Sequence, residues 1–488
     1  MVVKVEIICY TYIVKVENQI IKSIVKVENF ILPLIKGDFM KRTIENEIEK
    51  WFESSQKALL IDGARQVGKT YAVRAFARAR VNIKYIEINF YENTEARDLV
   101  NMAKSSDEIL LYLSTLYGAD LVKGETLIFF DEVQECEDII TAIKFLVEEG
   151  SYRYILSGSM LGVEMKNIRS VPVGYVDILH MYPMTFYEFC LANGVGENAI
   201  AHLRKSFNEV VSVQETIHEK FLKLYHLYLI VGGMPAVVQK YLDTNNLKVV
   251  EQEQLSIIEL YKKDIAKYDK KSKLYLAAVY DLIPSELNSQ NKRFIVGDIK
   301  DGIKFDRTKD AFLWLVDAGV AISVYCANEP KVPLILSKSR NLLKLFLSDV
   351  GLLAAMYANG IQVKILKQEL DINFGGIYEN AVGQELFANG IAMYYYKNNR
   401  IGELDFVCEI NGECVPIEVK SGKDYQKHSA LNNVLKSTAY NINKAIVFNN
   451  YNVSKDGAIV YYPIYMTMFL RNEKMEDYMY KLDLSDLS

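Results

Sequence analysis

Short apolar runs alternate with longer segments of helical periodicity in the first part of the chain. Apolar runs of strand length occur at residues 58–61, 83–89, 126–130, 154–156 and 176–180. Runs that are apolar on both faces are typical of strands buried in a parallel sheet. Residues 71–80, between the first two runs, have the pattern of a helix. The pattern therefore predicts an α/β domain with a five-stranded parallel sheet.

Helical periodicity dominates the middle of the chain. Residues 198–264 repeat apolar positions at helical intervals. Gly232, Gly233 and Pro235 interrupt this pattern, and a glycine pair before proline favours a tight turn. The sequence predicts a helical segment over 196–265 with one sharp corner.

Residues 266–345 have the element order of a winged helix. Three helices and then a hairpin are predicted, at residues 274–287, 294–299, 307–318, 320–325 and 333–336. The last helix of such a domain can enter the major groove of DNA. The basic residues that would approach phosphates are Lys304, Arg307, Lys309, Lys338 and Arg340. Winged helices also bind proteins, and the lysine-rich stretch at 262–273 has the pattern of a solvated helix face, so both partners stay open.

A second group of polar residues lies near the C-terminus, in two β-rich segments joined by Asn411 and Gly412. Asp405 belongs to the first segment, and Glu418 and Lys420 share one face of the second. This arrangement resembles the D…ExK core of the restriction-endonuclease fold. In that interpretation Asp405 and Glu418 chelate Mg²⁺ and Lys420 positions water, while Glu379, on a helix predicted at 378–388, completes the acidic set. The alternatives are an inactive DNA-binding domain and an ordinary hairpin with a surface salt bridge.

The first 39 residues contain a short repeat. The motif VKVE recurs at an interval of 11 residues, and no turn residues separate the copies. Three such short strands make a poor independent sheet. Our hypothesis is that translation begins at Met40, which detection of peptides from residues 1–39 would refute.

Composition and charge restrict the class of protein without identifying it. The 488 residues are half hydrophobic and about a quarter charged, with a net charge of −5, which is the profile of a globular multidomain protein. The six cysteines lack CxxC spacing, which argues against a zinc site or a disulfide framework. Apolar runs are too short to span a bilayer, so we expect a cytoplasmic protein without a membrane partner.

The strongest chemical signal follows the first predicted strand. Residues 63–70 read GARQVGKT, a GxxxxGKT phosphate-binding loop in strand–loop–helix context. Amides of a glycine-rich loop surround phosphates, and the helix N-terminus adds positive charge. Lys69 is expected to contact the β- and γ-phosphates of ATP, and Thr70 is expected to bind Mg²⁺. The residues expected to cradle the nucleotide are Gly63, Ala64, Arg65, Gln66, Val67, Gly68, Lys69 and Thr70.

Polar residues at the ends of two further strands supply the remaining candidates. Asp131 and Glu132 follow the apolar run at 126–130, at the strand end where ligands meet a parallel sheet. Asp131 is expected to hold Mg²⁺ and Glu132 to orient and polarise the attacking water. Ser157 and Ser159, after the fourth strand, are candidate γ-phosphate sensors, although small residues after strands are common.

These motifs resemble those of prokaryotic AAA-type ATPases that carry a C-terminal domain of unknown function. The matching segments are GARQVGKT, IFFDEVQ, ILSGS, YPMTFYEF, GGMP, GIYENAVGQEL, ELDFV and IEVKSG. The resemblance implies that the helical segment is a lid over the nucleotide. Many relatives have an arginine where this chain has Tyr175. If that arginine stabilises negative charge at the nucleotide, another residue must do so here. The candidates are Arg65, Arg169 and an arginine from a neighbouring subunit of a homo-oligomer.

We therefore expect a multidomain α/β protein: a P-loop parallel sheet with helical lid, a winged helix and a restriction-endonuclease-like α/β domain. The expected divisions are 1–39 (extension), 40–195 (ATPase), 196–265 (lid), 266–345 (winged helix), 346–450 (nuclease-like) and 451–488 (tail). The expected function is Mg²⁺-dependent ATP hydrolysis coupled to conformational change on DNA. An ATP-regulated nuclease and a non-enzymatic protein-interaction switch are the alternatives.

Overall fold

The computed structural model describes residues 40–80, 82–118, 121–159, 174–268, 273–288, 312–357, 360–367, 375–473 and 479. Several predictions of the sequence lie outside these residues: the repeat at 1–39, the helix at 294–299, and Arg169, Lys304, Arg307 and Lys309. The contacts discussed below fall within one compact unit, Arg42–Ser488.

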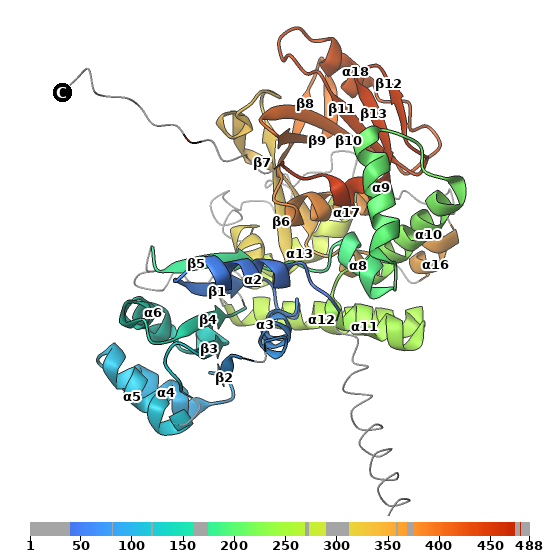
Figure 1. Cartoon of the computed structure of the whole chain (residues 1–488). Coiled ribbons are helices and arrows are strands. Elements are labelled where there is room, and N and C mark those ends of the chain that lie inside the picture. The colour runs from blue at the N-terminus through green and yellow to red at the C-terminus, as the bar shows by residue number, and fades with distance from the viewer. Residues whose placement is uncertain are drawn as a thin grey trace, which may run out of the picture. The chain divides into compact units, whose positions relative to one another are not determined.

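The first sheet confirms the predicted strand pattern (Figure 1). In the described part of the chain it has five strands, all parallel, in the order β2-β3-β4-β1-β5. The strands are β1 (Ala58–Asp62), β2 (Lys84–Asn89), β3 (Thr126–Asp131), β4 (Arg153–Ser157) and β5 (Val176–His180). Every residue of β3 is buried, as expected for a central strand covered on both faces.

Helices cover this sheet through the apolar residues that alternate along its strands. The helices of this part are α2 (Ile44–Ser54), α3 (Lys69–Arg78), α4 (Thr94–Met102), α5 (Ser106–Tyr117) and α6 (Glu137–Glu149). One core cluster joins Leu60, Phe130 and Leu156 to apolar residues of α4, α5 and α6. The alternate strand residues, such as Leu59 and Phe129, are also fully buried. The central strands β1, β3 and β4 therefore carry polar side chains only towards their ends.

The middle of the chain is helical, as predicted. Its helices are α8 (Phe186–Ala192), α9 (Glu197–Glu209), α10 (Glu215–Val231), α11 (Pro235–Thr244), α12 (Leu247–Tyr268) and α13 (Lys273–Asn288). The predicted corner lies between α10 and α11, whose axes differ by 119°. Among the described helices, no single one is long and apolar enough to cross a membrane, and the α10–α11 pair meets that criterion by length and composition only.

A mixed sheet forms the C-terminal part. Among the described residues it has eight strands in the order β12-β13-β11-β10-β9-β8-β6-β7. These are β6 (Ala321–Ala327), β7 (Lys338–Leu347), β8 (Ala392–Asn398), β9 (Gly402–Ile410), β10 (Glu413–Val419), β11 (Ala445–Asn449), β12 (Ser454–Asp456) and β13 (Ile459–Pro463). The accompanying helices are α15 (Val350–Ala355), α16 (Ile361–Lys367), α17 (Gly375–Ala388) and α18 (Ser429–Lys436), with 3₁₀ segments η4 (Leu334–Ser337) and η5 (Ile464–Phe469).

The predicted hairpin between β9 and β10 is present. Asn411 and Gly412 both have positive φ, 51° and 76°, as a two-residue type I′ connection requires. The register that follows from this turn pairs Val407 with Pro416 and Phe406 with Ile417.

Three sequence predictions differ from the structure in this region. The segment predicted as a strand at 333–336 instead leads into η4, which begins at Leu334. Pro333 has no amide hydrogen for a ladder, and the amide of Leu334 donates to Glu409 Oε2 over 3.1 Å. The return strand is β7 instead. β6 and β7, the strands at the predicted wing, also do not belong to a separate winged-helix domain. β6 pairs in parallel with β8, so both strands are part of the C-terminal sheet. Finally, β12 and β13 extend the sheet beyond residue 450, and the 3₁₀ segment η5 follows them, where we expected a tail.

Candidate functional site

The phosphate-binding loop connects β1 to α3. Gly63, its first residue, has φ +141°, and a Cβ there would lie 2.2 Å from the carbonyl oxygen of Met181. Only glycine allows this approach. The loop is thus pressed against the chain that leaves β5, the neighbouring strand.

Lys69 begins α3 and points back into the loop. Its Nζ donates to the carbonyl oxygens of Gly63 (3.0 Å) and Ala64 (2.8 Å). Burial lowers its pKa to about 8, against the opposing negative charges of Glu132 and Asp131. An ammonium group held by two carbonyls can be drawn towards phosphate oxygens, because a charged acceptor binds it more strongly.

Asp131 is the focus of the polar cluster at the sheet edge. It is 2 % exposed, and its Oδ2 accepts from Thr70 Oγ1 (3.0 Å) and Asn89 Nδ2 (3.2 Å). Its Oδ1 accepts from the Ser157 hydroxyl. Burial raises the pKa of Asp131, and the hydrogen bonds from Ser157 and Thr70 oppose that rise. A carboxylate and a hydroxyl at this spacing are the hard oxygen donors that Mg²⁺ prefers, so the residues fit that ion.

Glu132 lies beyond the end of β3 with left-handed backbone torsions (φ 53°, ψ 48°). Its carboxylate accepts a hydrogen bond from Gln134 Nε2, which also lies 3.4 Å from Ser159 Oγ. The structure thus brings Glu132, Ser157 and Ser159, which the sequence singled out, to one sheet edge. The sequence missed Asn89 and Gln134, although Asn89 ends the strand beside β3 and Gln134 lies two residues after Glu132.

Arg42 was also missed, because it lies well before the motif. Its guanidinium donates to the carbonyl oxygens of Val67 and Tyr182, each over 2.7 Å, and its Nε lies 3.2 Å from Glu188 Oε1. Arg42 and Glu188 are 5 % and 2 % exposed. Arg42 thus fixes one carbonyl of the loop from outside it.

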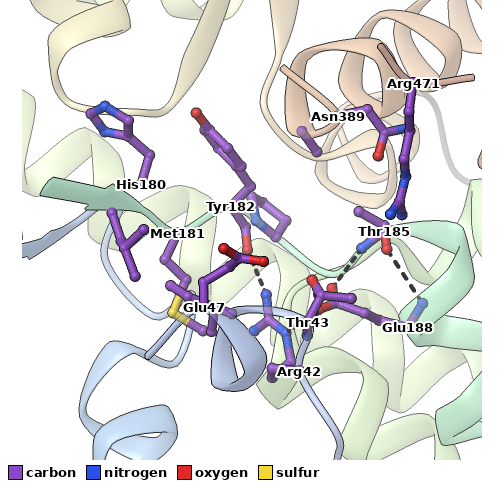
Figure 2. A pocket seen from close by; sticks show the side chains of 14 residues that line it. Arg42, Thr43, Glu47, His180, Met181, Tyr182, Thr185, Glu188, Asn389 and Arg471 are labelled. Carbon is purple, nitrogen blue, oxygen red and sulfur yellow. Dashed lines mark hydrogen bonds and ion pairs between the residues drawn. The ribbon is translucent and has the colours of Figure 1, made fainter. Parts of the chain in front are cut away.

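Two cavities border this region. Figure 2 shows one of about 260 Å³, lined by Arg42, Tyr182 and Glu188 and by Asn389 and Arg471 from the C-terminal part. The other, of about 430 Å³, is lined by residues at the start of the phosphate loop and by residues of the mixed sheet and its helices. Its polar lining residues are Asp62, His180, Tyr182, Asp317, Ser348 and Gln384. The loop is therefore flanked by space that it shares with the C-terminal part.

The loop arginine does not project freely. Arg65 Nη1 lies 2.8 Å and 3.0 Å from the two carboxylate oxygens of Asp264 on α12. Tyr175 donates to Glu148 Oε1 over 2.6 Å.

The C-terminal candidates assemble only in part. Asp405 Oδ2 accepts from the Val419 amide (2.9 Å), and Lys420 Nζ lies 3.2 Å from Glu418 Oε2. Burial and the neighbouring Asp405 charge raise the pKa of Glu418 well above its ordinary value, and the two carboxyl groups are hydrogen-bonded. Asp405, Glu418 and Lys420 therefore do lie together.

Glu379 has different surroundings from those we expected. It is 1 % exposed and lies 3.9 Å from Lys344, a fully buried lysine that also lies 3.1 Å from Glu403. Nowhere in the described ranges do three or more His, Cys, Asp or Glu side chains gather as a group that could hold a metal ion. The predicted acidic set of Glu379, Asp405 and Glu418 is therefore corrected to a carboxyl pair with one lysine.

The parallel sheet, its phosphate-binding loop and the Thr70–Asp131 contact form a P-loop nucleotide-binding fold of the AAA type. Residues 55–190 match a family model described as an AAA domain. Two further models match, at residues 222–364 and 374–466, and both are described as domains of unknown function (DUF8612 and DUF4143). A comparison with curated proteins found no match.

Solved structures also match the chain, at low identity. A Walker-type ATPase of Pyrococcus abyssi is 15% identical with a TM-score of 0.42, over 66% of this chain and 97% of that chain. An ORC1 protein of Aeropyrum pernix in complex with DNA is 12% identical with a TM-score of 0.29, over 69% and 96%. A Drosophila ORC structure bound to DNA is 15% identical with a TM-score of 0.22, over 66% and 94%. At these values we draw no function from these proteins.

Proposed function

We propose that this chain binds and hydrolyses Mg²⁺-ATP at the edge of the parallel sheet. The observation that carries the proposal is the 3.0 Å contact between Thr70 and Asp131 at the mouth of the loop that holds Lys69. Thr70 and Asp131 would hold Mg²⁺, which when bound neutralises phosphate charge. Lys69 would bind the β- and γ-phosphates in place of its two carbonyl partners.

Glu132 is proposed to orient and polarise the attacking water. Its carboxylate is held by Gln134, which also approaches Ser159. A hydroxyl at Ser157 or Ser159 would contact the γ-phosphate and so distinguish ATP from ADP. Arg42 would keep the Val67 carbonyl turned away from the phosphates, which leaves the loop amides free to donate.

Conformational coupling is proposed on contacts that join the ATPase part and the helical segment to the C-terminal part of the chain. The Phe186 amide donates to Glu385 on α17 over 3.0 Å. The Gly233 amide donates to Asp349, at the start of α15, over 2.5 Å. Both acceptors are buried. A movement of α15 or α17 would therefore either break these hydrogen bonds or move the donor segments along with the helix.

The experiment is a Mg²⁺-dependent ATPase assay of the chain from Met40, with and without DNA. We expect turnover that is lost in Lys69→Ala and Glu132→Gln, and stimulation by DNA if DNA is the partner. Turnover that is equal in Lys69→Ala and wild type would reject the site. Turnover that does not respond to DNA would leave the ATPase and reject DNA as the partner. Sedimentation with ATP present would test the homo-oligomer that an arginine supplied in trans requires.

An ATP-regulated nuclease is the second candidate, supported by the proximity of Asp405, Glu418 and Lys420. It predicts Mg²⁺-dependent nicking of plasmid DNA that Lys420→Ala abolishes. Lys427→Ala is the matched control, because Lys427 is 77 % exposed and pairs only with the nearby Asp424 among the ion pairs described here. ATP binding without DNA affinity or nicking would instead favour the protein-interaction switch.

A further inference from the structure

The phosphate loop is held from outside the AAA domain by two residues on one face of α12. Asp264 forms the two contacts with Arg65 Nη1 described above, and Tyr261, one turn earlier, donates from its hydroxyl to the Arg65 carbonyl oxygen over 3.0 Å. Both the side chain and the backbone of Arg65 are therefore bound to the same helix. Because residues three apart project from one side of a helix, one movement of α12 would release both contacts.

The segment after residue 317 also touches the loop. Gly319 has φ +72°, and a Cβ there would lie 2.9 Å from the Ala64 backbone nitrogen. Gly319, Tyr261 and Asp264 all belong to the region 222–364, which matches a domain of unknown function. That region thus contacts two consecutive loop residues, Ala64 and Arg65.

The two side chains of this ion pair differ in their exposure to solvent. The Asp264 side chain is 8 % exposed, whereas the Arg65 side chain is 34 % exposed. A cavity of only about 10 Å³ remains between them and the neighbouring Trp314 and Val320, hardly enough for one water. Loss of Arg65 would leave the Asp264 carboxylate with poor hydration, which is costly. Arg65 itself can turn towards solvent.

Arg65 belongs to the phosphate-binding loop itself, four residues before Lys69. Its charge contributes to the lowered pKa of Lys69, although burial contributes more. A triphosphate at Lys69 would carry several negative charges and would attract the same guanidinium, which binds phosphate and carboxylate in similar geometry. Asp264 and the terminal phosphate therefore compete for one cation.

We propose that Asp264 is an internal competitor of the ATP γ-phosphate for Arg65, and that α12 senses ATP through this exchange. Without nucleotide, Asp264 holds the guanidinium against α12. With ATP bound, the guanidinium turns to the γ-phosphate and α12 is released from the loop. This inference rests on the proposed ATPase function and adds the identity of the sensing helix and its positioning residue.

The first test is binding of the β,γ-imido analogue of ATP and of ADP to the full chain by calorimetry. Asp264→Asn removes the competing charge, so we expect at least roughly fivefold tighter binding of the analogue and a smaller change for ADP. In an Arg65→Ala background the same substitution should change affinity by less than about twofold, because no cation is left to release. Equal or weaker binding by Asp264→Asn, or a gain that persists without Arg65, would overturn the proposal.

Asp281→Asn is the matched control. Asp281 pairs with Lys262 on α12 over 2.9 Å. The substitution therefore removes a carboxylate that contacts α12 but leaves the contacts between α12 and the phosphate loop intact. Its affinity for the analogue should equal that of wild type. A gain equal to that of Asp264→Asn would show a general charge effect and reject the specific exchange.

The second test needs no variant and so does not depend on whether Asp264→Asn folds. Hydrogen exchange of the amides at 262–267 in wild-type protein should accelerate when the ATP analogue is added, and less with ADP. Unchanged exchange in protein that binds the analogue would reject the sensing role of α12 and leave the ATPase function standing. Failure of wild type to bind any nucleotide would instead reject the ATPase function, and with it this inference.

Discussion

Thr70 Oγ1 donates to Asp131 Oδ2 over 3.0 Å, which joins the first turn of α3 to the end of β3. Ser157 donates to the other oxygen of the same carboxylate from the end of β4. With Asn89 at the end of β2, four segments of the chain thus meet at this buried acid, which is the proposed Mg²⁺ ligand. The first prediction follows from this contact.

Ser157→Ala should raise the Mg²⁺ concentration needed for half-maximal ATPase activity by about tenfold. Loss of the hydroxyl removes a donor that stabilises the ionised form of Asp131. Without it, less opposes the effect of burial, so the pKa of Asp131 will rise further. Because Mg²⁺ needs the ionised carboxylate, the defect should be larger at pH 6 than at pH 8. Titration of Mg²⁺ at both pH values measures this. Ser54→Ala, at an exposed helix position, should have no effect.

Glu132→Gln should lower kcat by roughly 10²–10⁴-fold, the usual contribution of a general base. Affinity for ATP should stay within about twofold, because the amide preserves shape and the loop contacts remain. Single-turnover hydrolysis together with equilibrium binding separates the two effects. Glu137→Gln, five residues away and exposed, is the control. A Glu132→Gln protein that still turns over normally would remove Glu132 from its proposed role.

ATP affinity should fall as the pH rises above about 8. Burial lowers the pKa of Lys69 to about 8 in the free protein, so above that pH a proton must be taken up before the charged form can meet the phosphates. The dissociation constant should then approach a rise of about tenfold per pH unit. Calorimetry between pH 7 and pH 9.5 tests this. Lys69→Ala should bind weakly at every pH, and the same steep dependence in that variant would contradict the assignment.

Glu385→Gln should stabilise the protein at pH 8. Burial raises the pKa of Glu385 from its ordinary value of 4.5 to about 7, although the Phe186 amide donates to it. The folded protein therefore retains a proton that the unfolded chain releases, and this contribution to stability is lost as the pH rises from 4.5 through 7. A glutamine accepts the same amide without charge, so the gain at pH 8 should be about 1–3 kcal/mol.

The measurement is Tm at pH 5 and pH 8, where only the higher pH should show an increase for Glu385→Gln. Glu209→Gln, exposed at the end of α9, should show neither. A lower Tm for Glu385→Gln at pH 8 would contradict this prediction. It would mean that the hydrogen bond from the Phe186 amide to the ionised carboxylate stabilises the fold by more than burial of the charge destabilises it.

Local patterns predicted the parallel sheet and the positions of its polar strand ends. Apolar strand runs and the GxxxxGKT spacing depend on neighbours in sequence, and the structure brings Lys69, Thr70 and Asp131, which these patterns singled out, to one edge. Asn89 and Arg42 were not predicted, because nothing near them in sequence shows that they reach Asp131 and the Val67 carbonyl.

Long-range pairing explains the predictions that were wrong. The hairpin of β6 and β7 has the same local pattern in a winged helix as in the observed sheet, and only the β6–β8 pairing distinguishes them. Glu379 was assigned to the acidic set because its helix could face Asp405. Its proximity to buried Lys344 could not be read from the sequence, since a lysine is rarely fully buried.

The β6–β8 pairing crosses the division between the two domains of unknown function, because Tyr325 belongs to one family match and Tyr394 to the other. A gene fragment that ends near residue 370 would remove the parallel partner of β6, which would keep only β7, and would expose a row of unsatisfied amides and carbonyls on the free edge. Such fragments should precipitate or associate through strand addition. We therefore expect the two regions to fold as one unit and to be exchangeable only together.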